Sequence, residues 1–289
     1  MPEGDTIFRA AAQLRKAIEG ARVRSFRSDV LPHAQLEGLR IDKVEARGKN
    51  LLLRFESGRL LRTHMRMKGS WHIYREGEPW QRAARQARVE LHADNGFVAV
   101  LFGATQETAY RPSTGEAPYL TVPVIELLED DRALEASEVG SLGPDATTDS
   151  FDAAEAVRRL SSAPALAIGD ALLHQNLIAG AGNVIKSEAL YLCRQDPFAL
   201  IADLPVARLD AVVAEAHRLL LRNRDGGPRT SRESLDGGRL WVYGRSGQPC
   251  RVCGASLRMQ RQGASARSTY FCPACQPATS ALGLRNERR

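Results

Sequence analysis

Apolar residues follow a helical period near the start of the chain. Between Thr6 and Glu19 they recur at intervals of three and four, which places them on one face of a helix. Asp5 is a favourable N-cap for this helix, and Gly20 is a favourable residue just past its end. The pattern therefore predicts an amphipathic helix over Thr6–Glu19, with its apolar face on a core.

A strand-like pattern replaces the helical one from residue 51. Apolar runs at 51–55 and 60–65 flank a turn-like Glu-Ser-Gly-Arg stretch, and runs at 88–92 and 97–102 flank an Asp-Asn-Gly turn. Asn-Gly is a strong hairpin signal. Several hairpins at this spacing predict an N-terminal β-sandwich.

The helical period returns in the second half of the chain. The stretch 139–150 is rich in turn residues and is typical of a linker. Beyond it, helical spacing is found at 151–160, 168–178, 184–192 and 206–221. The change of period at a turn-rich stretch indicates a second, helical domain.

These patterns predict a multidomain α+β protein. We expect a β-sandwich domain with a leading helix over 1–125, a linker over 126–150 and a helical domain over 151–245. A small metal-binding module follows at 246–276, and the tail 277–289 is expected to be disordered.

Composition narrows the class of protein. The chain has 289 residues, 43% of them apolar, which suits a folded protein of two or more domains. It contains no run near the roughly 20 apolar residues of a membrane span, and its start does not resemble a secretory signal. We expect a cytoplasmic protein, associated with the nucleoid in a bacterium if it binds DNA.

Positive charge gathers toward the C-terminus. Residues 222–289 hold 13 Arg, no Lys and 4 acidic residues, although the whole chain carries only +6. A basic region of this kind indicates a polyanionic partner, most often nucleic acid, and the simpler alternative is a solvated face. The use of Arg favours phosphate, because a guanidinium can donate two hydrogen bonds to it at once.

Four of the five cysteines have the spacing of a metal site. Cys250, Cys253, Cys272 and Cys275 form two C-x2-C pairs separated by 18 residues, which is typical of one structural Zn²⁺ held by four thiolates. Paired disulfides are the alternative, and an intracellular location disfavours them. Cys193 lies in an apolar stretch and is expected in the core.

Four other positions could contact a polyanion. Asn183 follows a Gly-rich turn and is a natural N-cap for a helix whose start could bind phosphate, although a plain packing turn explains the stretch equally well. Lys49 begins an apolar strand, where a lysine is usually solvated. Arg267 lies five residues before Cys272, where surface decoration is the simpler interpretation on spacing alone. Met67 could belong to the core or protrude as an apolar wedge.

The N-terminus could itself carry chemistry. Removal of the initiator methionine, which small second residues permit, leaves Pro2 as a secondary amine ahead of a helix. The positive end of a helix lowers the pKa of such an amine and favours its nucleophilic neutral form. Attack on a sugar C1′ would displace a base and form an iminium, and Glu3 could move the protons. A trimmed terminus of no consequence is the alternative.

Five motifs together resemble one family. They are MPEG at the start, RGK around Lys49, HMRMKGSW, ALLHQNLIAGAGNVIKSE and CRVCG…RSTYFCPACQ, in this order over residues 1–276. The chain resembles the formamidopyrimidine-DNA glycosylase / endonuclease VIII family of base-excision repair. The opening MPEGDT and the stretch LWVYGRSGQPC are more similar to the endonuclease VIII branch.

The resemblance implies a fold and a set of roles. It implies a catalytic β-sandwich, a helix-two-turn-helix domain and a zinc finger. Pro2 would be the nucleophile, Glu3 the proton donor, and Lys49 a catalytic residue that contacts phosphate. The remaining DNA-binding candidates on this basis are Asn183, Lys186, Arg267 and the wedge Met67.

The activity implied is that of a monomeric, bifunctional DNA glycosylase and AP lyase. It would remove oxidised pyrimidines from duplex DNA by an iminium intermediate and β,δ-elimination. The alternatives are an 8-oxoguanine or formamidopyrimidine specialist of the same family, and a non-catalytic zinc-finger DNA-binding protein. Thr6 stands where the family often has Glu, and the loop after Phe102 shows no further wedge residues.

Overall fold

The computed structural model describes residues 2–103, 122–234 and 238–278. The expectations for the loop after Phe102 and for the tail from residue 279 therefore lie outside the described residues. The chain divides into two compact units, Met1–Ser141 and Leu142–Arg289, each considered by itself. Among the described helices, none combines the length and the apolar character needed to cross a membrane.

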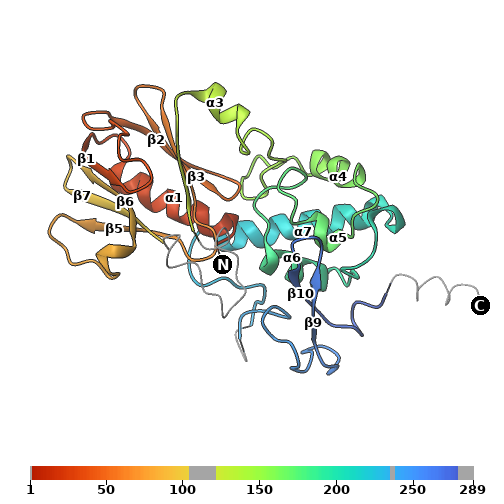
Figure 1. The fold of residues 1–289 in the computed structure, drawn as a ribbon. Coiled ribbons are helices and arrows are strands. Elements are labelled where there is room, and N and C mark those ends of the chain that lie inside the picture. Colours follow the sequence, from red (N-terminus) through yellow and green to blue (C-terminus); the bar gives the residue numbers. More distant parts are fainter. Residues whose placement is uncertain (1, 104–121, 235–237, 279–289) are drawn as a thin grey trace, which may run out of the picture. The chain divides into compact units, whose positions relative to one another are not determined.

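The first unit is a β-sandwich with one long helix, α1 (Gly4–Ile18) (Figure 1). One antiparallel sheet has the order β1 (Val23–Ser28), β6 (Ala87–Ala93), β7 (Phe97–Phe102) and β5 (Ser70–Arg75). The other has the order β2 (Ile41–Arg47), β3 (Asn50–Phe55), β4 (Leu60–His64) and β8 (Val124–Leu128). A short 3-10 turn, Ala84–Gln86, precedes β6. The predicted sandwich and both predicted hairpins are confirmed.

One apolar core joins α1 to both sheets. Ile7 and Leu14 of α1 are buried together with Leu53 of β3, Val89 of β6 and Leu101 of β7. The alternation of side chains along each strand delivers these residues to one face. The core fixes the position of α1, and with it the N-terminus of the protein.

The ends of α1 differ in part from the prediction. Asp5 is not the N-cap: Glu3 is the cap, and its carbonyl accepts the N–H groups of Thr6 and Ile7. Asp5 lies buried in the first turn, where its carboxylate accepts the Thr6 N–H at 2.7 Å. Gly20 follows the helix with a φ of +85°, as a glycine at this position should.

The first unit continues past the expected boundary at residue 125. Strand β8 ends at Leu128 and pairs with β4, and helix α3 (Asp131–Ala136) follows. Asp130 caps α3 by accepting the Ala133 N–H at 2.8 Å. The stretch 126–150 is therefore not a plain linker, since ordered elements occupy its first part and the units divide after Ser141.

The second unit is helical and ends in a hairpin. Its helices are α4 (Ala153–Ser161), α5 (Ile168–Ala171), α6 (Asn183–Leu192) and α7 (Val206–Arg224), with a 3-10 turn at Ile201–Asp203. Strands β9 (Arg258–Gln262) and β10 (Arg267–Phe271) form the hairpin. The apolar faces of the helices enclose a core that includes Ile185, Leu190, Val212 and Leu219.

The helix expected over 168–178 is much shorter in the structure. Only α5 is helical, because the side chain of Gln175 binds the backbone of the turn that follows. Its amide donates to the carbonyls of Leu173 and Ala181 and accepts the Gly180 N–H. These bonds replace helical ones, and apolar spacing alone did not reveal them.

Candidate active site and nucleic-acid interface

Helix α1 runs antiparallel to strand β2. Near its C-terminal end, the Gly20 N–H donates to the Ile41 carbonyl at 2.7 Å. One turn and a half earlier, the Arg15 guanidinium donates to the Val44 carbonyl at 2.7 and 3.0 Å. The chain therefore runs in opposite directions in α1 and in β2.

This direction brings the start of α1 to the turn between β2 and β3. From Arg15 back to Gly4 the helix is about 16 Å long, and from Val44 on to Arg47, just before the turn, the strand covers about 10 Å in the same direction. The N-terminal end of α1 and the β2–β3 turn consequently lie at the same edge of the first unit (Figure 1). Pro2, Glu3 and Lys49, predicted from separate motifs, gather there.

Glu3 and Pro2 are held firmly at this edge. Glu3 is completely buried and Pro2 is half-buried. The extended backbone of Glu3 (φ −125°, ψ 179°) turns directly into α1. The terminus is thus fixed by its own helix, beside the four or so orphan N–H groups that give a helix start its positive potential.

Lys49 lies in a tight turn rather than at the start of a strand. Gly48 and Lys49 join β2 to β3, and the left-handed φ of +60° at Gly48 suits a glycine. The side chain of Lys49 is half-buried. A lysine fixed in a two-residue hairpin turn has less freedom than one on an open strand end.

His64 is a member of this edge that sequence reasoning missed. The β3–β4 register pairs Leu51 with Thr63, so His64 lies opposite the residue after Lys49. Burial, and then the positive charges of Arg66, Lys49 and Arg62, lower the pKa of His64 to about 3. The imidazole is therefore neutral, and its Nδ1 accepts the Arg66 N–H at 3.1 Å. The HMRMKGSW motif contains His64 but does not show its surroundings.

Met67 protrudes from a closed turn between β4 and β5. The Gly69 N–H donates to the Met65 carbonyl at 2.9 Å, and a Cβ at Gly69 would lie only 2.4 Å from that oxygen. Met67 is 39% exposed, whereas Met65 is 2% exposed and belongs to the core. Of the two interpretations open for Met67, the core is excluded.

In the second unit, Asn183 begins α6 but does not cap it. Gly182 is the cap, because its extended backbone directly precedes the helix and its carbonyl accepts the Lys186 N–H. The side chain of Asn183 is 7% exposed, and its Oδ1 finds no hydrogen-bond partner among the described residues. Rotation of the amide exchanges its oxygen and nitrogen. A buried amide at a helix start can therefore offer a donor to an anion.

Lys186 does not fit the expected contact with DNA. It is completely buried, and its Nζ donates to the Ser268 carbonyl at 3.0 Å and to the Thr269 hydroxyl at 2.7 Å. A covered ammonium bound to β10 is not available to a phosphate. The structure instead gives Lys186 a link between α6 and the hairpin.

Arg267 begins strand β10, immediately after a turn in which Ala266 has a φ of +48°. Its side chain is half-exposed and makes no hydrogen bond or ion pair with the residues that the structure describes. Many of the other arginines are engaged with carboxylates or carbonyls, as Arg224 is with Asp149. Arg267 is therefore a cation with its donors available at one end of the hairpin.

Glu188 is a second residue that the sequence did not reveal. It is buried on α6, and its carboxylate accepts the N–H groups of Trp241, Val242 and Tyr243 at 2.8–2.9 Å and the hydroxyl of Ser231. A carboxylate that accepts several backbone N–H groups fixes a loop firmly. Its only sequence signal is that it is the one acidic residue of α6.

The four predicted cysteines form a metal site. The Sγ atoms of Cys250, Cys253, Cys272 and Cys275 lie within 4.8 Å of one another. The Cys250–Cys275 separation is 3.9 Å, and Cys253 lies 3.5 Å from both Cys272 and Cys275. Tetrahedral zinc with Zn–S bonds of about 2.3 Å separates its sulfurs by about 3.8 Å. The cluster fits one structural Zn²⁺ with no open position.

Cys193 lies apart from this cluster. Its thiol is half-buried and donates to the Ala211 carbonyl. Burial, and then the charge of Glu215, raise the pKa of Cys193 to about 11. The residue is therefore a poor nucleophile and packs against the helical core, as expected.

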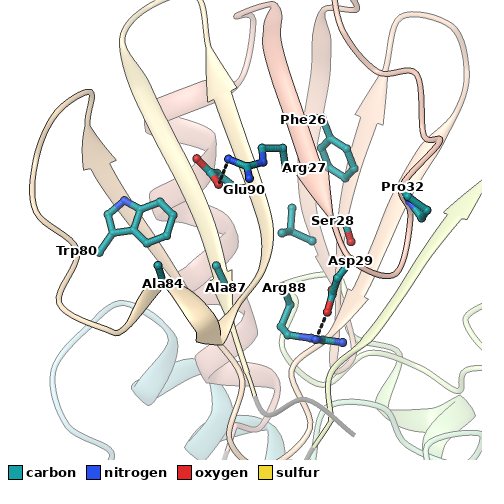
Figure 2. A pocket seen from close by; sticks show the side chains of 11 residues that line it. Phe26, Arg27, Ser28, Asp29, Pro32, Trp80, Ala84, Ala87, Arg88 and Glu90 are labelled. Atoms are coloured by element: carbon teal, nitrogen blue, oxygen red, sulfur yellow. Dashed lines mark hydrogen bonds and ion pairs between the residues drawn. The ribbon is translucent and has the colours of Figure 1, made fainter. Parts of the chain in front are cut away.

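One pocket of the first unit lies away from the residues of the α1 edge. It has a volume of about 620 Å³ and lies between the end of β1 and the Trp80–Ala84 segment (Figure 2). Its charged side chains pair with one another, Arg27 with Glu90 and Arg88 with Asp29. Pro2, Glu3 and Lys49 are not among its lining residues.

Comparison with known proteins identifies the three parts of the chain. Residues 1–105 match the formamidopyrimidine-DNA glycosylase N-terminal domain, and residues 142–232 match the H2TH domain of the same glycosylase. Residues 247–278 match the zinc finger found in FPG and IleRS. The H2TH match confirms the predicted helix-two-turn-helix, and the finger match agrees with the geometry of the zinc site.

Two relatives and one solved structure extend over nearly the whole chain. Probable endonuclease 8 2 of Streptomyces coelicolor is 38% identical over 281 residues, covering 96% of this chain and 94% of that protein. The DNA-(apurinic or apyrimidinic site) lyase Nei2 of Mycolicibacterium smegmatis is 33% identical, covering 96% of this chain and all of that protein. Lactococcus lactis Fpg, solved with N7-benzyl-Fapy-dG DNA, has a TM-score of 0.75 at 23% identity, covering 96% and 100%.

The Lactococcus lactis structure shows that the chain has the same fold, and the Streptomyces and Mycolicibacterium relatives show that the sequences are related. Since the family domains occur in order and both relatives exceed 30% identity over nearly their full lengths, the chain belongs to the formamidopyrimidine-DNA glycosylase / endonuclease VIII family, on its endonuclease VIII branch.

Proposed function

We propose that this protein is a bifunctional DNA glycosylase and AP lyase of base-excision repair that removes oxidised bases, with a preference for pyrimidines. The observation that carries the proposal is the meeting of Pro2, Glu3 and Lys49 at one edge of the first unit. A nucleophile, an acid and a cation within one small region are what the reaction needs. Family membership and the endonuclease 8 names of the relatives support the same activity.

Pro2 would act as the nucleophile once Met1 is removed. Its nitrogen forms a bond to C1′ of the damaged nucleotide, while the C1′–base bond breaks and its electron pair leaves with the base. Glu3 supplies a proton as the base departs and the sugar ring opens. The Pro2 nitrogen loses its proton, and its lone pair then forms a double bond to C1′ as the C1′–O4′ bond breaks and Glu3 protonates O4′. The product is an iminium between Pro2 and C1′, which keeps a positive charge because its nitrogen has no proton left to lose.

The iminium makes strand cleavage possible. Its charge acidifies the C2′ proton, and removal of that proton expels the 3′ phosphate in a first elimination. A second elimination expels the 5′ phosphate, and hydrolysis of the iminium releases the enzyme. Lys49, next to the reacting sugar, would stabilise the leaving phosphate.

The second unit would hold the DNA. The Asn183 amide at the start of α6 and the Arg267 guanidinium are the side chains proposed to bind backbone phosphates. Met67 would fill the space that an extruded base leaves in the stack. We further propose that the protein acts as a monomer on chromosomal DNA, and so within the nucleoid of a bacterium.

Borohydride trapping tests the proposal directly. A single preparation carrying a removable tag ahead of Pro2 is assayed before and after the tag and Met1 are removed, with intact mass as the check. Before removal, the Pro2 nitrogen is an amide without an available lone pair. We expect trapping on lesion-bearing duplexes and strand cleavage only after removal, with binding to a non-cleavable duplex unchanged.

A panel of substrates and one variant sharpen the test. Oxidised-pyrimidine, 8-oxoguanine, abasic and undamaged duplexes rank the lesion classes, and strongest trapping on 8-oxoguanine would favour the alternative specificity. Glu3→Gln should impair base excision more than cleavage of an abasic site, where no base has to leave. Trapping by the form that retains Met1 would exclude Pro2 as nucleophile, and no trapping by either form would favour a DNA-binding protein without catalysis.

A further inference from the structure

The hairpin that carries Arg267 is bound to α6 by a buried ammonium. Lys186 Nζ donates to the Ser268 carbonyl at 3.0 Å and to the Thr269 hydroxyl at 2.7 Å. Ser268 is the residue next to Arg267, and Lys186 and Thr269 are both completely buried. The contact therefore acts on the backbone directly behind the Arg267 side chain.

The same network reaches the other strand of the hairpin. The Thr269 hydroxyl donates to Gln262 Oε1 at 2.7 Å, and Gln262 Nε2 donates to the Pro197 carbonyl at 2.8 Å. Gln262 is the cross-strand partner of Arg267 in the β9–β10 register. Arg267 thus has a fixed neighbour along its own strand and another across the hairpin.

A buried lysine is an expensive way to fill space. Removing an ammonium from water carries a large desolvation cost, and an apolar side chain of similar volume would pack with less loss. Charge-assisted hydrogen bonds provide direction, which apolar packing lacks. The use of lysine here indicates that the position of the hairpin matters, and not only its attachment.

We propose that Lys186 is a positioning residue for Arg267. It fixes the hairpin relative to Asn183, which precedes it by three residues, or about 4.5 Å, on the same helix. The spacing of the two side chains that bind phosphate is then set by α6 itself. This inference rests on the proposed function, in which Asn183 and Arg267 bind backbone phosphates.

The test measures binding of the full-length protein to a duplex containing a tetrahydrofuran abasic-site analogue over a range of salt. Arg267→Ala should lower affinity about tenfold and flatten the salt dependence by about one phosphate contact. Lys186→Met should produce most of the same loss and the same flattening. Added to Arg267→Ala, it should have almost no further effect, because both changes remove one contact.

Two further variants keep the test decisive. Lys43→Met removes the same charge from an exposed site that is paired with Glu45, and it should leave affinity unchanged. Thr269→Val removes one acceptor of the Lys186 ammonium while preserving volume, and it should give a smaller loss of the same kind. If Lys186→Met loses zinc, the decision rests on Thr269→Val, measured at full zinc content.

The outcomes separate this inference from the proposed function. If the losses of affinity add fully when Lys186→Met is combined with Arg267→Ala, Lys186 contributes to stability alone. The same conclusion follows if the salt dependence is unchanged in both Lys186→Met and Thr269→Val. No effect of Arg267→Ala would remove the contact to be positioned and overturn the inference. Borohydride trapping by the same proteins reports separately whether the catalytic proposal holds.

Discussion

The two units hold their functional side chains by different means. In the first, Pro2, Lys49 and Met67 lie at the ends of elements, and an apolar core beneath α1 and two sheets fixes those ends. In the second, Asn183 and Arg267 belong to elements joined by buried polar side chains and a zinc site. The functional side chains of the first unit are positioned by apolar packing, and those of the second unit by hydrogen bonds and a metal site.

This difference predicts that the two units fail under different conditions. Apolar burial is insensitive to chelators. Thiolate ligands are lost when zinc is removed or when protons compete for them. Damage to one unit should therefore leave the other largely intact, and the following changes test that expectation.

The largest effect is expected from loss of zinc. Cys272→Ser removes one of four ligands, so the finger should lose its metal and binding to lesion DNA should fall at least tenfold, since metal binding is coupled to folding. Zinc content by metal analysis and affinity by anisotropy measure this. Cys193→Ser, outside the cluster, is the matched control and should retain both. Full zinc and full cleavage in Cys272→Ser would contradict the assignment.

A cavity in the core of the first unit should lower stability without loss of zinc, in contrast to Cys272→Ser. Leu53 is completely buried in the core beneath α1, and Leu53→Ala should lower the free energy of unfolding by about 2–5 kcal/mol. Zinc content should not change. Urea denaturation of the full chain measures the loss, and Leu200→Ala, at a 43% exposed position of the second unit, is the control. Zinc loss in Leu53→Ala would show that the units are not independent.

A smaller, selective effect is expected at Met67. Met67→Ala should slow excision of an intact lesion several-fold more than cleavage of an abasic site, because only the former requires base extrusion, which costs a few kcal/mol. Single-turnover rates on both substrates give the ratio. Met65→Ala, a change in the core two residues away, should affect both rates alike. Equal losses for Met67→Ala would argue against the wedge.

The smallest effect concerns His64 and pH. Its pKa of about 3 in the folded protein lies below the roughly 6.5 of an unfolded chain. The neutral form is favoured by folding, so this contribution to stability is complete above pH 6.5 and is lost as pH falls toward 3. His64→Asn keeps an acceptor for the Arg66 N–H and should flatten the fall in Tm between pH 7 and 5. His33→Asn, at an exposed position, is the matched control for the loss of a histidine.

Much of the fold follows from spacing alone. The α1 stripe, the β3–β4 and β6–β7 hairpins and the cysteine pairs depend on neighbours in sequence, and the structure confirms them. The limits of α5 and α6 do not follow, because the Gln175 amide and the Gly182 backbone decide them. These are contacts of single side chains and dihedral angles, which leave no period in the sequence.

The site divides in the same way. Sequence motifs identified Pro2 and Lys49, but not that both lie at the same edge of the first unit, which required the direction of α1 against β2. Lys186 was predicted on the DNA because it shares a motif with Asn183, and burial overturned this. His64 and Glu188 were missed since their importance arises from charges and backbone groups remote in sequence.

The arrangement on α6 also restricts how the chain can change in length. An inserted residue between Asn183 and Glu188 would turn everything beyond it by about 100° and move it about 1.5 Å along the axis. The carboxylate of Glu188 would then no longer face the three N–H groups that it accepts, and the Lys186 ammonium would leave the hairpin. Insertions within α6 should consequently be poorly tolerated. The length of α6 fixes the spacing of Asn183, Lys186 and Glu188, so engineering should alter this helix by substitution and not by insertion.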